Sequence, residues 1–349
     1  MFGKTKKKGP DRPVEMSGDH LLEVRDLNVN IRVEEDTLHA VRGVNFVLGR
    51  GETLGLVGES GCGKSVTSKE IMGINPKNCA SSGEVLFRTK SGETVNLLTL
   101  EKDGAVYRAL RGSEIAMIFQ EPMTAFSPLY TVGNQMAELV LLHTPGADKR
   151  QARARVLEMM KKVGIANPER RVDQYPYEFS GGMLQRALIA MMLCCNPTLL
   201  IADEPTTALD VTIQAQILEL MKGLQKEFSM SILFITHDLG AVAGMCDRVA
   251  VMYLGQIVET GSVRQIFHNA CHPYTRGLLR SLPKMDQNRD ERLYAIRGVV
   301  PLPVGLKPSC GFHERCEQCV PGKCDCTEIQ PVEVEPGHFV RCELVKKGG

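Results

Sequence analysis

Eight consecutive residues, Gly58–Ser65, have the types and spacing needed to hold a phosphate group. They fit the pattern G-x-x-x-x-G-K-[ST] at every fixed position, after a strand-like stretch and before a helical one. Glycines let backbone N–H groups turn toward phosphate oxygens, and the helix directs its positive end at the same anion. Lys64 is expected to reach the β and γ phosphates, and the Ser65 hydroxyl to bind Mg²⁺. The predicted nucleotide contacts here are Gly58, Glu59, Ser60, Gly61, Cys62, Gly63, Lys64, Ser65 and Val66.

A second reactive group is the acidic pair Asp203 and Glu204, which ends the buried-strand pattern 199–202. Asp203 is predicted to hold Mg²⁺ through water. Glu204 is expected to orient and polarise the water that attacks the terminal phosphate. Such a pair alone would more often cap a loop. Downstream of a phosphate-binding motif, it predicts hydrolysis of ATP.

The run Phe179–Met183, which reads FSGGM and is followed by LQR, resembles the signature of the ABC family of transport ATPases. The variant is the one typical of peptide importers. Ser180, Gly181 and Gly182 would open a helix whose N-terminus can meet a phosphate. Because Gly58–Ser65 fills that role within this subunit, the resemblance implies that these three residues cap ATP bound to an opposing subunit.

Three further positions resemble the same family. Gln120, after the strand-like run 115–119, resembles the Q-loop glutamine, which touches the metal and the attacking water. Asp210, in the run Ala208-Leu209-Asp210, resembles the D-loop, which crosses to the partner. His237 resembles the switch histidine, which contacts the γ-phosphate. The resemblance covers about residues 20–262, and it implies the following roles: catalysis by Glu204, His237 and Gln120, and Mg²⁺ contacts from Ser65, Gln120 and Asp203.

Two phrases resemble the oligopeptide/dipeptide/nickel importer group. Gln120–Pro128, with Thr131–Gly133 and Gln135 behind it, resembles the segment that grips the coupling helix of a membrane partner. His272–Leu279, which reads HPYTRGLL, resembles that group's C-terminal extension. The resemblance implies an ATPase subunit that powers import of dipeptides or oligopeptides by nucleotide-driven dimer closure. It also implies a peripheral position on the cytoplasmic face of the cell inner membrane.

The implied partners are a second ABC ATPase subunit in a heterodimer, two membrane permease subunits and, indirectly, an extracytoplasmic substrate-binding protein. Nickel or glutathione import by the same family stays an alternative. So does a soluble ABC ATPase outside transport. The apolar stretch 187–202 is split by Asn196 and Pro197, so no transmembrane segment is expected. The net charge of +1 predicts no nucleic-acid partner.

Six of the 12 cysteines fall between Cys310 and Cys342. Resembling importers place four cysteines in this extension, and some hold a [4Fe–4S] cluster there. By that resemblance the ligands are Cys310, Cys316, Cys324 and Cys342, with Cys319 and Cys326 as extra thiols. Thiolates also suit zinc, although structural zinc sites usually show paired C-x₂-C knuckles and only Cys316 and Cys319 make one. We favour the cluster over zinc, with unligated thiols third.

The family usually stacks the adenine on an aromatic ring upstream of the phosphate loop. Between Val24 and Val41 the sequence has no Phe, Tyr or Trp, and His39 is the one ring there. Ile31 or Val33 could pack more weakly on the base. The base contact is therefore left open.

These groups must be positioned by elements that alternate between strand-like and helix-like patterns, as in an α/β fold. Buried-strand patterns occur at 53–57, 198–202 and 232–236, and helical spacing occurs at 133–143 and 149–163. We expect an α/β P-loop ABC ATPase core with a helical subdomain and a small Cys-rich C-terminal extension. The expected domains are a basic flexible N-terminal tail at 1–20, an ATPase domain at 21–261 and an extension at 262–349. The helical subdomain is expected at about 121–200.

Overall fold

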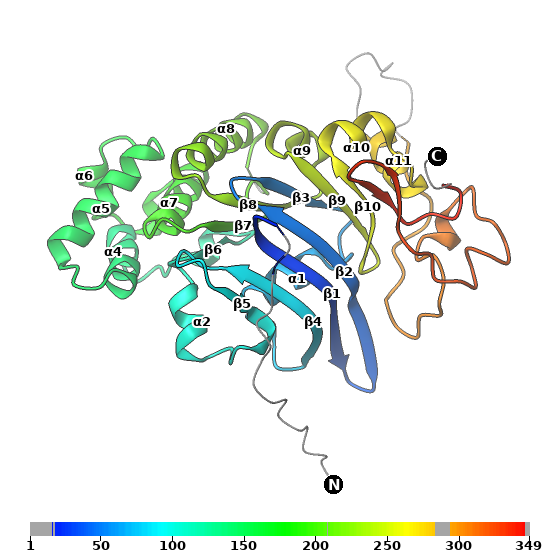
Figure 1. Cartoon of the computed structure of the whole chain (residues 1–349). Coiled ribbons are helices and arrows are strands. Elements are labelled where there is room, and N and C mark those ends of the chain that lie inside the picture. The colour runs from blue at the N-terminus through cyan, green and yellow to red at the C-terminus, as the bar shows by residue number, and fades with distance from the viewer. Residues whose placement is uncertain (1–15, 17, 208, 283–293, 346–349) are drawn as a thin grey trace, which may run out of the picture.

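The computed structural model describes residues 16, 18–207, 209–282 and 294–345. Most of the expected N-terminal tail, and Ala208 of the expected D-loop, lie outside these residues. Within them the chain forms two sheets, with helices α8 to α10 along one side of the larger sheet and α4 to α7 grouped at one end (Figure 1). No helix of the described part combines the length and apolar character that a membrane span requires.

The larger sheet has the strand order β11-β12-β10-β9-β3-β8-β7-β6 in the described residues. Its centre is parallel, with β3 paired to β8 and β9, and β7 paired to β8 and β6. Parallel strands buried on both faces are expected to be mostly apolar, and the polar residues of these strands lie at their ends, such as Asp203 and Arg248. The parallel strands are β3 Thr53–Val57, β6 Ile115–Ile118, β7 Leu199–Asp203, β8 Ser231–Thr236 and β9 Arg248–Tyr253. Strand β10, Gln256–Ser262, pairs antiparallel with β9.

The smaller sheet is antiparallel, with the order β2-β1-β4-β5. One core lies between it and the larger sheet, where Leu54 and Leu56 of β3 meet Val29 and Val41 of the smaller sheet. Each fully buried aliphatic side chain contributes roughly 1.5–3 kcal/mol to stability. The bounds are β1 His20–Val33, β2 Asp36–Gly49, β4 Cys79–Arg88 and β5 Thr94–Asn96, with α1 Lys64–Ile71 and α2 Ala105–Leu110 nearby.

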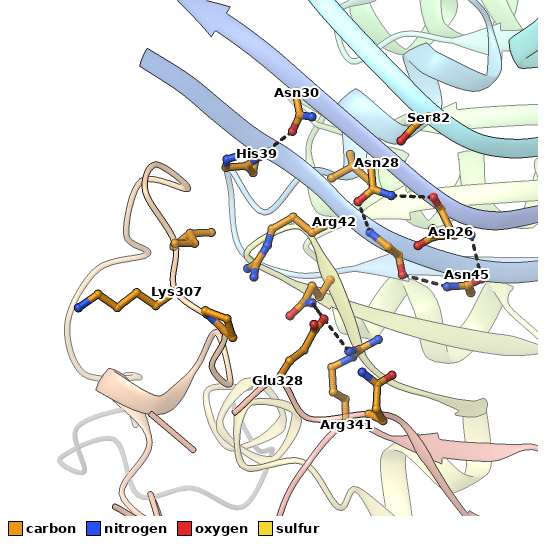
Figure 2. Close-up of a pocket in the computed structure, with 16 residues that line it drawn as sticks. Asp26, Asn28, Asn30, His39, Arg42, Asn45, Ser82, Lys307, Glu328 and Arg341 are labelled. Atoms are coloured by element: carbon orange, nitrogen blue, oxygen red, sulfur yellow. Dashed lines mark hydrogen bonds and ion pairs between the residues drawn. The ribbon is translucent and has the colours of Figure 1, made fainter. Parts of the chain in front are cut away.

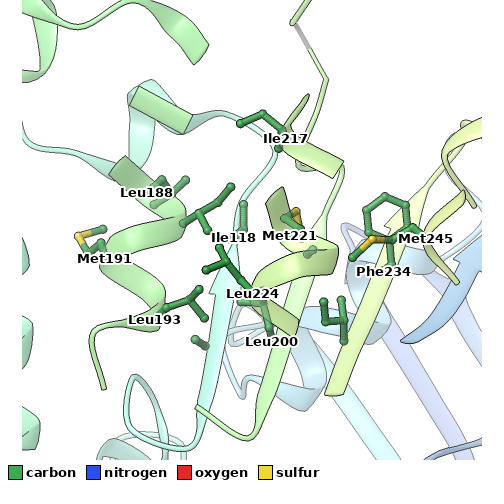
Figure 3. Close-up of a cluster of buried hydrophobic side chains, with 14 of the residues drawn as sticks. Ile118, Leu188, Met191, Leu193, Leu200, Ile217, Met221, Leu224, Phe234 and Met245 are labelled. Atoms are coloured by element: carbon green, nitrogen blue, oxygen red, sulfur yellow. The ribbon is translucent and has the colours of Figure 1, made fainter. Parts of the chain in front are cut away.

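A second core fills the opposite face of the larger sheet. Figure 3 shows Leu188 of α7 and Met221 of α8 packed over Ile118 and Leu200 of the strands. The alternation of strand side chains between the two cores fixes the sheet in place. The helices are α3 Pro122–Ala125, α4 Val132–His143, α5 Lys149–Lys162, α6 Pro168–Arg171, α7 Gly181–Leu193, α8 Val211–Phe228 and α9 Leu239–Met245. Helices α3 to α7 fall in the stretch proposed as the helical subdomain.

Beyond β10 the chain forms α10 Val263–Asn269 and α11 Pro273–Arg280, and later a hairpin of β11 Val332–Glu335 and β12 His338–Val340. Strand β12 pairs antiparallel with β10. The C-terminal extension therefore adds two strands to the edge of the ATPase sheet. The proposed boundary at 261/262 lies where β10 passes into α10.

Candidate active site

Four predicted site segments follow four neighbouring parallel strands. The phosphate loop follows β3, Gln120 follows β6, Glu204 follows β7 and His237 follows β8. The carboxyl ends of parallel strands meet at one edge of a sheet, which is where ligands bind in such folds. The sheet order therefore brings together residues that are far apart in the sequence.

These segments surround a cavity of about 780 Å³, a volume typical of sites for small-molecule ligands. Its lining comprises every predicted loop residue from Glu59 to Val66, together with Gln120, Glu204, Thr207 and His237. Gly58 and Asp203 reach the cavity through their bonds to Lys64 and Ser65.

The phosphate loop requires glycine at two positions. Gly63 has a φ of 106°, and a Cβ there would lie 2.4 Å from the Ala40 carbonyl oxygen. Gly58 has a φ of 155°, and its Cβ would lie 2.1 Å from the Met252 carbonyl oxygen. L-residues rarely adopt such backbone and would also clash. The motif glycines therefore fix the loop against β2 and β9.

Lys64 is almost fully buried at the floor of the cavity. Its Nζ donates to the carbonyl oxygens of Gly58, at 2.7 Å, and Glu59, at 3.0 Å. Its remaining contact is the Cys62 Sγ at 3.7 Å, a weak acceptor. A phosphate oxygen is a much stronger acceptor, so one ammonium proton is available to it.

Ser65 and Asp203 lie together, with the Ser65 Oγ donating to the Asp203 Oδ1 at 3.1 Å. Ser68 Oγ lies 3.4 Å from the other carboxylate oxygen. Burial raises the pKa of Asp203, and the hydrogen bond from Ser65 opposes that rise. A buried carboxylate and a hydroxyl, both hard oxygen donors, fit the ligand preference of Mg²⁺.

Glu204 is held by three side chains. His237 Nδ1 contacts its Oε1 at 3.1 Å, while Thr207 Oγ1 and Gln120 Nε2 donate to its Oε2 at 3.0 and 3.2 Å. Burial acts to raise the pKa of Glu204, but the hydrogen bonds from His237 and Thr207 outweigh it and leave the pKa lowered. The carboxylate is therefore ionised at neutral pH and can accept a hydrogen bond from water.

The predicted signature and D-loop residues lie outside this cavity. Ser180 is exposed and caps α7 through a bond from the Met183 N–H, and Gly181 is exposed beside it. Asp210 is exposed and caps α8 through a bond from the Ile213 N–H at 3.0 Å. The two caps are neighbours, because a Cβ on Gly182 would lie 2.8 Å from the Ile213 side chain. Within this one chain they do not contact the phosphate loop.

The residues considered for the adenine contact lie in different places. His39 is turned away: its Nδ1 pairs with Asn30 Oδ1 at 2.7 Å, and it lines a separate polar cavity of about 640 Å³ (Figure 2). Ile31, Leu38, Leu302 and Pro303 line the nucleotide cavity instead. The last two come from the C-terminal extension, attached where the His39 N–H donates to the Pro303 carbonyl at 2.8 Å. No sequence motif marks them.

Other residues of the extension also reach the phosphate loop. Tyr274, in the HPY phrase, accepts a hydrogen bond from the Glu59 N–H at 2.8 Å. Arg315 forms an ion pair with the Glu59 carboxylate at 2.7 Å. The sequence singled out the phrase that contains Tyr274 without giving it a role. Nothing in the sequence indicated a role for Arg315, apart from its place in the cysteine-rich segment.

The four predicted cysteine ligands lie in one region. Cys310 N–H donates to the Cys324 carbonyl at 2.7 Å, and the Val320 N–H donates to the Cys324 Sγ at 3.4 Å. Burial raises the pKa of Cys310 and of Cys342 to about 11, and the neighbouring thiols add to the rise. Among the described residues, no three of these thiols lie within 4.8 Å of one another. Zinc would need its four thiolates about 4 Å apart, given Zn–S bonds of about 2.3 Å.

One triad of potential ligand atoms does meet that distance, namely Glu259, Cys271 and His338. It was not expected from the sequence. Its carboxylate already accepts hydrogen bonds from the Cys271 N–H at 2.7 Å, the His272 N–H at 3.0 Å and His338 Nε2 at 2.8 Å. These bonds explain the triad as a structural link between β10, α11 and β12.

Comparison with known proteins adds a family to this geometry. Residues 41–207 match the model of the ABC transporter family, and residues 258–324 match that of the oligopeptide/dipeptide transporter C-terminal region. A probable peptide ABC transporter ATP-binding protein of Sinorhizobium fredii is 50% identical over 93% of this chain and 95% of its own length. An oligopeptide transport ATP-binding protein of Bacillus subtilis is 54% identical over 93% of this chain and 89% of its own length.

The fold has solved counterparts as well. A dimeric ATP-binding cassette in a post-hydrolysis state, bound to ADP and Pi, has a TM-score of 0.61 and 26% identity over 70% of this chain and 99% of its own. A cassette of a cbiONQ transporter from Clostridium perfringens has a TM-score of 0.59 and 29% identity over 72% of this chain and 92% of its own. ATP and Mg²⁺ are the ligands that such a site implies. This chain therefore belongs to the ABC transporter ATPases, in the group that carries the oligopeptide/dipeptide transporter C-terminal region.

Proposed function

We propose that this chain is the ATP-hydrolysing subunit of an importer of dipeptides or oligopeptides. The observation that carries the proposal is the meeting of the phosphate loop, Gln120, Glu204 and His237 around one cavity at the ends of four adjacent strands. The names of the relatives in Sinorhizobium and Bacillus support a peptide cargo. Nickel and glutathione stay alternative cargoes. A soluble ABC ATPase outside transport is the rival from another class.

The residues of the cavity have distinct roles in hydrolysis. The loop N–H groups and Lys64 bind the phosphates, and Ser65 and Asp203 would hold Mg²⁺, which neutralises phosphate charge when bound. Glu204 accepts a hydrogen bond from the attacking water and aligns it with the terminal phosphorus. His237 and Gln120 hold the Glu204 carboxylate in place. His237 is proposed to contact the terminal phosphate as well, and Gln120 the metal and the attacking water.

The complete site needs a second ATPase subunit. Ser180, Gly181 and Gly182 begin a helix of 13 residues, and exposed N–H groups at such a terminus bind anions. They lie outside the cavity that the phosphate loop of their own chain lines, so they are proposed to cap ATP held by the partner. Asp210 and the exposed Val211 would lie at the same seam. The dimeric cassette among the solved relatives supports this arrangement, and we propose a heterodimer with a related ATPase.

A surface beside Gln120 is suited to a membrane partner. Leu129 and Tyr130 are 78% and 60% exposed, and Gln135 holds their loop by donating to the carbonyl oxygens of Ser127 and Tyr130 at 3.0 Å. Exposed apolar groups on a braced loop are typical of a protein interface. We propose that this loop grips the coupling helix of one of two membrane permease subunits, which an extracytoplasmic binding protein supplies with cargo. The chain would then act at the cytoplasmic face of the cell inner membrane.

The cysteine site is proposed to hold a [4Fe–4S] cluster on Cys310, Cys316, Cys324 and Cys342. The four thiols form a soft donor set in one region, as an iron–sulfur cluster requires. Zinc is the second choice, because structural zinc sites usually have paired C-x₂-C knuckles and only Cys316 and Cys319 form such a pair. Such a cluster would supply a structural or redox-sensing centre, and no hydrolysis step depends on it.

The test of the proposed function uses the assembled transporter. Glu204→Gln keeps the size and hydrogen-bonding capacity of the side chain but removes its basicity. It is expected to bind ATP normally and to lower ATP turnover and peptide uptake by about 10²- to 10⁴-fold. Full turnover in this variant would remove Glu204 from its role. Capture of nucleic acid in place of membrane subunits by the tagged chain would favour the rival.

A further inference from the structure

A residue of the cysteine-rich segment is paired directly with the phosphate loop. Arg315 Nη1 donates to Glu59 Oε2 at 2.7 Å, and its Nη2 donates to Glu59 Oε1 at 3.1 Å. The two residues are 256 positions apart in the sequence. The Arg315 side chain is 6% exposed and the Glu59 side chain 29%. A paired, largely buried contact of this kind is among the stronger polar interactions in proteins.

Further hydrogen bonds fix the backbone of Glu59. Its N–H donates to the Tyr274 hydroxyl at 2.8 Å, and its carbonyl accepts from the Lys64 ammonium at 3.0 Å. Glu59 is the second residue of the phosphate loop, and the lysine it contacts is the one aimed at the phosphates. The position of Glu59 is therefore fixed by contacts from both the loop and the C-terminal extension.

Arg315 is itself held in place by contacts with other residues. Its Nε donates to the Arg297 carbonyl at 2.8 Å, and its guanidinium lies over the rings of Tyr253 and Phe312, at 5.7 and 5.9 Å from their centroids. Such contacts already restrict the guanidinium, so pairing with Glu59 costs little further side-chain entropy. Arg315 is thus a preorganised cation behind the loop.

The negative charge of Glu59 explains why a cation is needed at this position. Glu59 lines the cavity that is proposed to hold a triphosphate, and an unpaired carboxylate there would repel the phosphate charges. Arg315 neutralises that carboxylate through the two hydrogen bonds. Its neighbour in the chain is Cys316, so the fold of the cysteine segment determines whether the guanidinium is in place.

We propose that Arg315 is a positioning residue of the ATP site, which neutralises Glu59 and makes ATP affinity depend on the fold of the cysteine-bearing segment. The inference rests on the proposed function, since it assumes that the cavity binds ATP.

The experiment measures equilibrium binding of Mg·ATP by the full chain in the Glu204→Gln background, with thermal unfolding in parallel. Arg315→Ala is expected to raise the Kd for ATP about tenfold, a typical size for coupling between contacting sites. Adding Glu59→Gln to Arg315→Ala is expected to restore most of the affinity, because the repelling charge is gone. Arg297→Ala is the matched control, since that side chain is 85% exposed and lies 3.8 Å from Glu317. It is expected to leave the Kd unchanged.

A purely structural role would give a different pattern. Arg315→Ala would then lower the unfolding temperature, and Glu59→Gln would not rescue the Kd. That result, or an unchanged Kd in Arg315→Ala, overturns the inference while leaving the proposed function intact. If the parent chain binds no ATP, the proposed function fails as well. Should Arg315→Ala fail to fold, Arg315→Lys replaces it, with a smaller rise in Kd that Glu59→Gln again reverses.

Discussion

The backbone conformation of Glu204 and the hydrogen bonds around it position its carboxylate. Glu204 has a φ of 49°, a left-handed conformation that costs a non-glycine residue about 1 kcal/mol. Its N–H donates to the Ile235 carbonyl at 2.8 Å, and its carboxylate has the three partners described above. Strain of this kind persists where neighbouring contacts determine the conformation, which is typical of functional sites. The turn after β7 therefore aims the carboxylate into the cavity.

Leu302 provides a test of the base side. Its side chain is 77% exposed at the edge of the cavity and would lose contact with water against an adenine. Leu302→Ala should cost about 1 kcal/mol of ATP binding, or roughly a fivefold rise in KM with little change in kcat. Val299→Ala is the control, because Val299 is 84% exposed in the same segment and lies outside the cavity lining. Equal KM values for the two variants would exclude Leu302 from base binding.

At the scale of elements, the extension is attached through strand β10 and helix α11. The Glu259 carboxylate on β10 is fully buried and joins the start of α11 to His338 of β12. Helix α11 begins at a buried His272, whose Nδ1 accepts from the Tyr274 N–H at 3.1 Å. This cap places Tyr274 where its hydroxyl meets the phosphate loop. A neutral imidazole is required, since a protonated ring has no acceptor at Nδ1.

The cap predicts a pH dependence of stability. Burial lowers the pKa of His272 to about 3, with a smaller contribution from Arg276. In the unfolded chain the imidazole has its ordinary pKa of about 6.5, so below that pH the unfolded chain binds a proton that the folded chain does not. The free energy of unfolding therefore falls by about 1.4 kcal/mol for each pH unit below about 6.5. His272→Asn keeps a capping acceptor and removes the titration. The free energy of unfolding, measured between pH 7.5 and pH 5, should fall less steeply in the variant; parallel curves would refute the assignment.

Across the whole molecule, the extension closes back on the nucleotide side of the ATPase domain. Figure 1 places the hairpin β11–β12 beside β10, and the segment before it runs past β2. Along this path Pro303 contacts His39, Arg315 contacts Glu59, and Glu328 contacts Gln256. Contacts at three separated points make the extension part of the ATPase core rather than an independent body.

This arrangement predicts that the cysteine site and the ATP site respond together. The double variant Cys310→Ser, Cys316→Ser should lose the visible absorbance and iron of the anaerobically purified chain. It should also bind ATP more weakly, because Arg315 follows the displaced segment. Cys326→Ser is the control, since that thiol is exposed and outside the proposed ligand set. Colourless, zinc-containing parent protein would contradict the cluster, and unchanged ATP affinity in the double variant would contradict the coupling.

The amino-acid sequence by itself determined the chemistry of the phosphate site. Gly58–Ser65 is a contiguous motif, and a contiguous motif with its flanking strand and helix needs no distant contact to be recognised. The order of the apolar strands also predicted the α/β fold, which the solved ABC cassettes confirm. The spacing of Ser180, Gln120 and His237 indicated the family, which the relatives confirm.

Only the tertiary structure decided which residues distant in the sequence lie around that site. Leu302, Pro303 and Arg315 belong to a segment with little regular structure, so no periodicity marks their direction. Their places follow from the pairing of β12 with β10, a contact between residues 259–260 and 339–340 that no local pattern encodes. His39 shows the converse, because a ring that the sequence offered for the base is turned away by its bond to Asn30. Local motifs specify chemistry, whereas long-range packing selects the side chains that surround it.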